Sequence, residues 1–324
     1  MESGLTVQQM NSFVSSISNI LRCPCCHNHL PIIDCAQEIR CLACGTKFPI
    51  VRGVPILLNE KSSLFSITET TVARKESTGL RQLVARTLPN IDRNVKAERN
   101  YERFAKLLLT DSSQPTVLVI GAGVLGSGHS TLFAHPEIRL IETDVKLYQR
   151  IVLACDAHEL PFDNASFDGV VCQAVLEHVL DPYQCVQEIH RVLKQCGLVY
   201  AETPFMQQVH GGRYDFTRFT DLGHRRLFRR FEEIDRGAVC GPGMALAWAV
   251  QYFLLSFAES KTMRDIIEAS TRITLFPLKY WDYYLIDKRA TLDAASGYYF
   301  LGRKSENTLD DKELLRDYRG LIPS

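Results

Sequence analysis

The sequence has no excess of charge of either sign, because 37 Lys and Arg balance 37 Asp and Glu among its 324 residues. It therefore lacks the basic signature typical of nucleic-acid binding, which removes one reason to propose RNA or DNA as a partner. The strongly apolar segment 244–258 falls short of the ~18–20 residues that span a bilayer. The first residues lack a charged region followed by an apolar one, so we expect no signal peptide and a cytoplasmic location.

Apolar residues make up 46% of the chain, which is enough to form a sizeable core. Its length suits one large domain or two smaller ones. The eleven cysteines are an odd number without a secretion signal, so disulfides are not expected.

The cysteines cluster between residues 23 and 44, where two Cys-x-x-Cys pairs are separated by fourteen residues. This spacing is typical of tetrahedral zinc bound by four thiolates. The four predicted ligands are Cys23, Cys26, Cys41 and Cys44. Substitute ligands remain open, namely Cys25, Cys35, His27 and His29, as does a set of free buried cysteines. A domain this small buries too little surface to fold alone, so zinc would be structural.

A second pattern lies at residues 116–144, where an apolar run is followed by glycines and a second apolar run ends in acids. The apolar runs predict strands buried on both faces of a parallel sheet. Gly121, Gly123 and Gly126 form a G-x-G-x-x-G motif, which lets the backbone approach a nucleotide closely. Asp144 follows at the distance expected for an acid that binds a ribose diol. The motif alone is weak, and an NAD-dependent oxidoreductase would share it.

The N-terminal segment resembles a known family of zinc ribbons. Its motifs are L-x-C-P-x-C at 21–26, C-x-x-C-G at 41–45 and F-P-I-x-x-G-V-P at 48–55. Together they are similar to Trm112-like proteins over residues 18–60. Members of that family accompany methyltransferases as separate subunits or as fused domains, so the resemblance implies a methyltransferase in the remainder of the chain.

The downstream sequence resembles class I, type 11-like, S-adenosylmethionine-dependent methyltransferases. It carries D-A-x-x-L-P-F at 156–162, S-F-D-x-V at 166–170 and L-E-H-V at 176–179. The resemblance implies that Asp144 binds the ribose hydroxyls and that Asp156 and the Ala157 amide bind the adenine. The cofactor-binding set that it implies is Gly121, Gly123, Asp144, Asp156, Ala157 and Gln173. Ile120 departs from the family pattern, which often has an acid at this position.

The resulting fold prediction is α/β, with a Rossmann-like sheet of seven strands whose last strand is antiparallel. We expect a helix and zinc ribbon over 1–58, a linker over 59–94, a methyltransferase domain over 95–305 and a tail over 306–324. Residues 241–295 would form a helical insertion before the last strand. This insertion is a candidate cover for the acceptor pocket, an interface for a homo-oligomer or a site of peripheral membrane contact.

The predicted acceptor site lies in residues 205–220, which follow the fifth strand and combine polar and aromatic side chains. The candidate catalytic residues are His210, Tyr214 and His178, with Asp215 behind them. His178 also has a purely structural interpretation, as part of a helix start. A small molecule or a saccharide is the favoured acceptor, and a non-catalytic scaffold that docks partners through the zinc ribbon remains an alternative.

Overall fold

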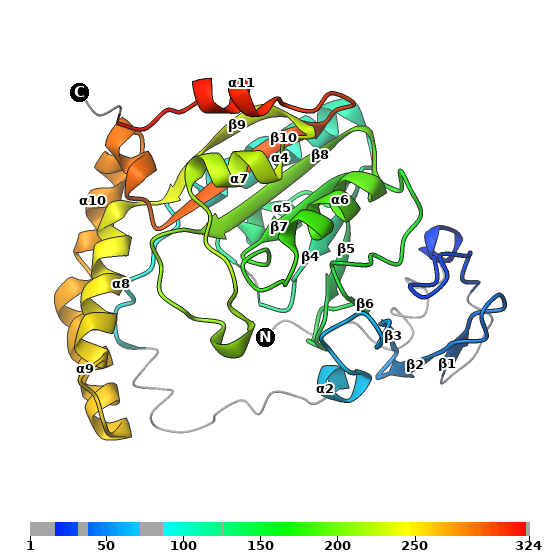
Figure 1. Cartoon of the computed structure of the whole chain (residues 1–324), viewed down its shortest axis with the longest axis horizontal. Coiled ribbons are helices and arrows are strands. Elements are labelled where there is room, and N and C mark those ends of the chain that lie inside the picture. The colour runs from blue at the N-terminus through cyan, green and yellow to red at the C-terminus, as the bar shows by residue number, and fades with distance from the viewer. Residues whose placement is uncertain (1–16, 32–37, 72–86, 125, 322–324) are drawn as a thin grey trace.

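The computed structural model describes residues 17–31, 38–71, 87–124 and 126–321. Its central feature is a ten-stranded sheet in the order β1-β2-β3-β6-β5-β4-β7-β8-β10-β9 (Figure 1). The strands are β1 (Glu38–Arg40), β2 (Lys47–Val51), β3 (Val54–Leu57), β4 (Thr116–Ile120), β5 (Arg139–Asp144), β6 (Leu153–Cys155), β7 (Phe167–Gln173), β8 (Leu193–Pro204), β9 (Phe231–Cys240) and β10 (Gly297–Lys304). The α/β class is confirmed, but the predicted count of seven strands is wrong.

Strands β6, β5, β4, β7 and β8 are parallel neighbours, and β10 is antiparallel to both β8 and β9. The antiparallel last strand is therefore confirmed. The apolar run 117–120 is buried throughout, as expected for a central strand covered on both faces. Since these strands are parallel, their carboxyl ends meet at one edge of the sheet, which is where ligands bind in such folds.

The three additional strands come from the cysteine-rich N-terminal segment. All four residues of β3 are buried, and Ile56 and Leu57 pair in parallel with Ala154 and Cys155 of β6. The Arg22 amide also donates to the carbonyl of Pro161 at 3.0 Å. The apolar Val-Pro-Ile-Leu run thus extends the main sheet. This is why the sheet exceeds the predicted seven strands.

Helices cover both faces of the sheet. On one face lie α4 (Ala97–Asp111) and α5 (His129–Phe133), and on the other α6 (Pro182–Val192) and α7 (Asp221–Leu227). Side-chain caps fix two of their starts, because Asp181 accepts the Gln184 amide and Thr220 accepts the Gly223 amide. The helix expected near the N-terminus lies mostly at 1–16, outside the described residues, and Ser18–Ile20 forms a 3₁₀ turn, η1.

A helical layer stands at the end of the sheet opposite β1 and β2 (Figure 1). It consists of α8 (Pro242–Leu255), α9 (Lys261–Leu275), α10 (Leu278–Leu285) and η3 (Arg289–Asp293), all between β9 and β10. We call these helices the cap. Buried Asp282 of α10 accepts the amides of Gly243 and Met244 at 2.7 and 3.0 Å, so a carboxylate caps the N-terminus of α8.

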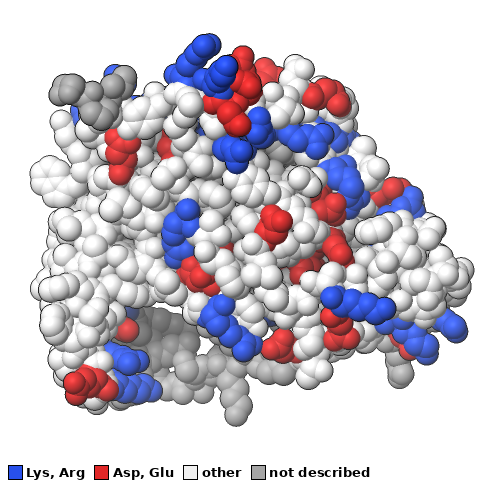
Figure 2. Space-filling model, viewed as in Figure 1, with Lys and Arg blue, Asp and Glu red and all other residues white. Residues whose placement is uncertain are grey.

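The cap exposes many large apolar side chains, among them Leu246, Phe253, Ile266, Ile273, Trp281 and Tyr284. Figure 2 shows this edge uncharged along much of its length, with residues of both signs at its lower end, and charges of both signs are interspersed over the rest of that face. Within the described residues, none of the helices combines the length and apolarity needed to cross a membrane. Homo-oligomer formation and peripheral membrane contact through the cap stay predictions.

The segments outside the predicted methyltransferase domain make contacts of their own. Helix α2 (Ile67–Thr71) lies within the predicted linker, and Trp248 of the cap donates to Asp92 at 2.6 Å. The tail carries α11 (Asp311–Arg316), followed by Asp317, which forms an ion pair with buried Arg236 at 2.5 Å. Both segments therefore pack against the sheet or the cap.

We predict that the contact between β3 and β6 contributes substantially to stability. Ile56 is fully buried, so Ile56→Ala should lower the free energy of unfolding by about 2–5 kcal/mol through lost contacts and a cavity. Leu42→Ala is the control, since Leu42 is 70% exposed and its truncation should cost less than about 0.5 kcal/mol. Chemical denaturation measures both, and equal stabilities would contradict the docking of β3.

Candidate functional site

The site begins at the turn between β4 and α5. Gly121 has φ +74°, and a Cβ there would lie 2.2 Å from the Val175 side chain. A Cβ on Gly123 would lie 2.2 Å from the Tyr148 ring and 2.7 Å from Asp144 Oδ2. Glycine is therefore required at both positions, by a left-handed backbone at the first and by close approach at the second.

Asp144, at the end of β5, lies directly against this turn. Its Oδ2 accepts the Gly123 amide at 3.0 Å, and its Oδ1 accepts the Lys146 amide at 2.9 Å. Burial raises the pKa of this carboxyl, although the two amides partly offset the effect. Neighbouring Glu142 is engaged elsewhere, in a bidentate pair with Arg150. Of the two acids in the motif, Asp144 is the one beside the glycines.

Asp156 follows β6 and forms a compact set of hydrogen bonds. One oxygen accepts the His158 amide at 3.0 Å and its Nδ1–H at 2.6 Å, and the other accepts the Ser63 hydroxyl at 2.5 Å. Burial opposes ionisation, but these bonds lower the pKa of Asp156 overall. Ser63 belongs to the predicted linker, so sequence reasoning did not find this contact. Ala157 is buried beside Asp156.

Gln173, at the end of β7, connects the glycine turn to β8. Its Nε2 donates to the Ser127 carbonyl at 3.1 Å and to Glu202 Oε2 at 2.8 Å. Its Oε1 accepts the Tyr101 hydroxyl at 3.1 Å and lies 3.1 Å from His129 Nδ1. Gln173 therefore supports the glycine turn. The resemblance implies that this same residue binds the cofactor.

Glu202 is a buried acid that sequence reasoning missed. Asn94 and Gln173 donate to its Oε2 at 2.7 and 2.8 Å, and the Tyr200 hydroxyl donates to Oε1. Burial raises its pKa to about 7, and these hydrogen bonds limit the increase. The pattern Leu198–Pro204 predicted the strand but gave no sign that this carboxyl points inward.

The predicted acceptor residues fall into two groups. The rings of His178 and His210 lie 5.0 Å apart, so the structure brings these two together. The Tyr214 ring instead stacks on Phe65 at 5.2 Å, and its hydroxyl accepts from Arg213. The role of each in catalysis stays a prediction.

Residues 205–220 are held as a defined loop. Asp215 accepts the amides of His210 and Gly211 at 2.8 and 3.1 Å. Arg218 pairs with Asp215 and also donates to the carbonyls of Gln207 and Gln208. Burial opposes ionisation of Asp215, but Arg218 and the amides hold its pKa well below the ordinary range.

Helix α8 of the cap contacts this loop. The Tyr252 hydroxyl donates to the Val209 carbonyl at 2.9 Å, and the Trp248 ring lies 6.3 Å from that of His210. The cap and the loop after β8 are therefore in contact next to the two histidines.

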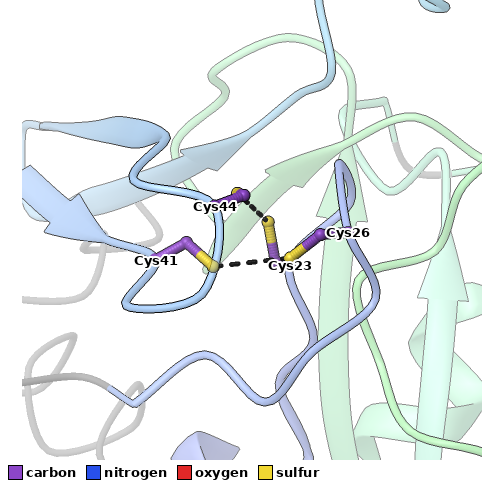
Figure 3. Close-up of side chains that lie close together, drawn as sticks. All are labelled: Cys23, Cys26, Cys41 and Cys44. Atoms are coloured by element: carbon purple, nitrogen blue, oxygen red, sulfur yellow. Dashed lines mark hydrogen bonds between the residues drawn. The ribbon is translucent and has the colours of Figure 1, made fainter.

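The four predicted zinc ligands also meet (Figure 3). Their sulfurs lie within 4.8 Å of one another, with Cys23 3.7 Å from Cys44 and Cys26 3.6 Å from Cys41. Hydrogen bonds from Thr46 lower the pKa of Cys44 to about 6, and hydrogen bonds from Asn28 lower that of Cys26. Cys25, His27 and His29 are outside this cluster, and Cys35 lies outside the described residues.

A family model described as a methyltransferase domain matches residues 133–201. The chain carries a methyltransferase domain. The matched segment includes β5 to most of β8, and with it Asp144, Asp156 and Gln173. No curated protein matches the chain.

The solved structures to which the chain is similar include three methyltransferase systems. Haemonchus contortus phosphoethanolamine N-methyltransferase 2 shares 16% identity over 72% of this chain and 61% of its own, with TM-score 0.39. Geranyl diphosphate C-methyltransferase from Streptomyces coelicolor shares 12% over 67% and 86%, with TM-score 0.38. A chain from a complex containing the Haloferax volcanii Trm112 methyltransferase activator shares 17% over 71% and 100%, with TM-score 0.37. Such low identities carry no information on the acceptor.

We predict that the raised pKa of Glu202 makes stability depend on pH. The folded chain holds this proton up to about pH 7, whereas the ordinary value is 4.5, so folding stability should fall as the pH rises between these values. Glu202→Gln cannot ionise and should lose this dependence. The difference in Tm, wild type minus variant, should therefore decrease from pH 4.5 to 7.

The matched control is Glu137→Gln, because Glu137 is exposed. Its Tm should follow that of the wild type across the range. If the Glu202→Gln difference stays constant with pH, Glu202 does not carry the proton that we assign to it.

Proposed function

We propose that the protein is an S-adenosylmethionine-dependent methyltransferase, active in the cytoplasm, with a structural zinc ion in its N-terminal segment. The observation that carries this proposal is the contact of the glycine turn with Asp144, which lies inside the methyltransferase-domain match. A small molecule or saccharide is the acceptor class that we favour, because the charge is balanced and the cap is apolar and aromatic.

The residues present fit the cofactor. Glycine at positions 121 and 123 lets the turn lie directly against Val175 and Asp144, and Asp144 offers carboxylate oxygens to two ribose hydroxyls. Asp156 and the Ala157 amide offer an acceptor and a donor for the adenine edge. No acid precedes the first glycine, so we assign the methionine end to the backbone of the turn, which Gln173 supports.

S-adenosylmethionine supplies an electrophilic methyl group when bound. The contribution of the chain is alignment and exclusion of water, which can account for much of the rate of such a displacement. The loop 205–220 and α8 are in contact beside the site, so they are placed to hold an acceptor. A base is required only where the acceptor is a hydroxyl or a protonated amine.

The Cys cluster fits structural zinc. With Zn–S bonds of ~2.3 Å, sulfurs at the corners of a tetrahedron are separated by about 3.8 Å. The two measured separations, 3.6 and 3.7 Å, are close to that value. Zinc would join the turn at Cys23 to the hairpin that follows Cys41, and so stabilise the segment that supplies β3.

We predict that Asp144→Asn weakens binding of S-adenosylhomocysteine about 10- to 100-fold, because a charged acceptor is worth roughly 1.5–3 kcal/mol to the ribose hydroxyls. Titration calorimetry measures this without an acceptor. Asp265→Asn is the control, since Asp265 lies exposed on α9. Binding of NAD in place of adenosylhomocysteine would favour an oxidoreductase and overturn the proposal, and unchanged affinity in Asp144→Asn would remove the ribose assignment.

For zinc, we predict that Cys41→Ser contains one ion fewer per chain than the wild type. Cys25→Ser is the matched control, because Cys25 is in the same segment but outside the cluster, and it should keep the wild-type content. Elemental analysis of the purified chains measures both. Equal zinc content in Cys41→Ser and wild type would exclude the four-cysteine site.

A further inference from the structure

Glu177 is a buried acid whose neighbours at ion-pair distance are two histidines. It follows β7, its side chain is 0% exposed, and neither carboxylate oxygen accepts a hydrogen bond within the described part of the chain. A carboxylate buried in this way is costly unless a cation or several donors face it. The question is therefore which group satisfies it.

Two imidazoles face this carboxylate. Nε2 of His178 lies 3.8 Å from Glu177 Oε1, and Nε2 of His210 lies 3.7 Å from the same oxygen. Both separations exceed hydrogen-bond distance. The three side chains thus converge on a common point without bonding to one another.

The other ring nitrogens define the tautomers. Nδ1 of His178 lies 2.7 Å from the Tyr214 carbonyl, and Nδ1 of His210 lies 3.3 Å from the Gln208 carbonyl. A carbonyl only accepts, so each Nδ1 carries a hydrogen, and in the neutral form of each ring Nε2 is the nitrogen left to bind a metal. Histidines that bind metal are usually oriented by such a bond from the second nitrogen.

Backbone contacts hold the segments that carry His178 and His210 next to each other. The Glu177 carbonyl accepts the Phe216 amide at 2.8 Å, which attaches the loop 205–220 to the turn after β7. Gly211 allows the loop to approach, since a Cβ there would lie 2.5 Å from the His178 ring. The cluster therefore combines two elements far apart in the sequence.

We propose that Glu177, His178 and His210 bind a divalent transition-metal ion. Two imidazoles and one carboxylate are a donor set that suits Zn²⁺ and similar ions, and three protein ligands leave open positions. All three ligand atoms lie within 4.8 Å of one another, and bonds of ~2.0–2.2 Å would bring them to a single ion with small shifts. The ion would neutralise the buried carboxylate.

The ion would lie beside the predicted acceptor region, next to α8. An acceptor hydroxyl bound at one of its open positions would have a lowered pKa and could release its proton to bulk water near neutral pH. On this model His178 and His210 are ligands and not bases. The part about the acceptor rests on the proposed function, whereas metal binding itself does not.

The test counts zinc in the full chain, stripped with a chelator and then reconstituted with Zn²⁺ alone. The wild type should hold about two ions, one of them in the cysteine cluster. Glu177→Gln and His210→Ala should each hold about one, as should Cys41→Ser. His135→Ala is the matched control, because His135 is a partly buried histidine that pairs with Glu102 outside the cluster, and it should hold about two.

A second measurement distinguishes the loss of a metal ligand from a folding defect in the variant. Bound Co²⁺ in Cys41→Ser should give a visible absorption spectrum that disappears in Cys41→Ser/His210→Ala, while circular dichroism of the two variants stays the same. Wild-type zinc content in both Glu177→Gln and His210→Ala would overturn the metal site. No cofactor or acceptor is present, so this failure is distinct from loss of adenosylhomocysteine binding.

Discussion

The buried carboxylate of Glu202 constrains the whole ligand edge of the sheet. A buried carboxyl group needs hydrogen-bond partners, and they come from Asn94 before α4, from Tyr200 on β8 and from Gln173 on β7. Gln173 then reaches the Ser127 carbonyl in the glycine turn. A polar network that runs from Glu202 through Gln173 therefore supports the glycine turn. Its donors belong to different parts of the fold, so the network ties these parts together.

The sequence predicted those parts of the site whose signal is local. Apolar runs placed β4 and β5, glycine spacing located the turn, and the Cys-x-x-Cys pairs located four sulfurs that do converge. In each case the residues are close along the chain or are fixed by the ends of adjacent parallel strands.

What the sequence left open depends on contacts between distant segments. Ser63 reaches Asp156 only because β3 joins β6, and the Val-Pro-Ile-Leu run would be apolar in a separate ribbon as well. Glu177 and His210 meet only because the loop after β8 folds back onto the turn after β7. Contacts between such distant segments leave no periodic pattern of residues in the sequence, so they cannot be predicted from hydrophobic periodicity.

The pairing of β3 with β6 changes what the N-terminal segment can do as a partner. A subunit that binds reversibly is present or absent according to its concentration and affinity. Here the contact between β3 and β6 is intramolecular, so its effective concentration is high and its stoichiometry is fixed at one. The hairpin and the edge of the sheet that it completes would therefore be gained or lost together.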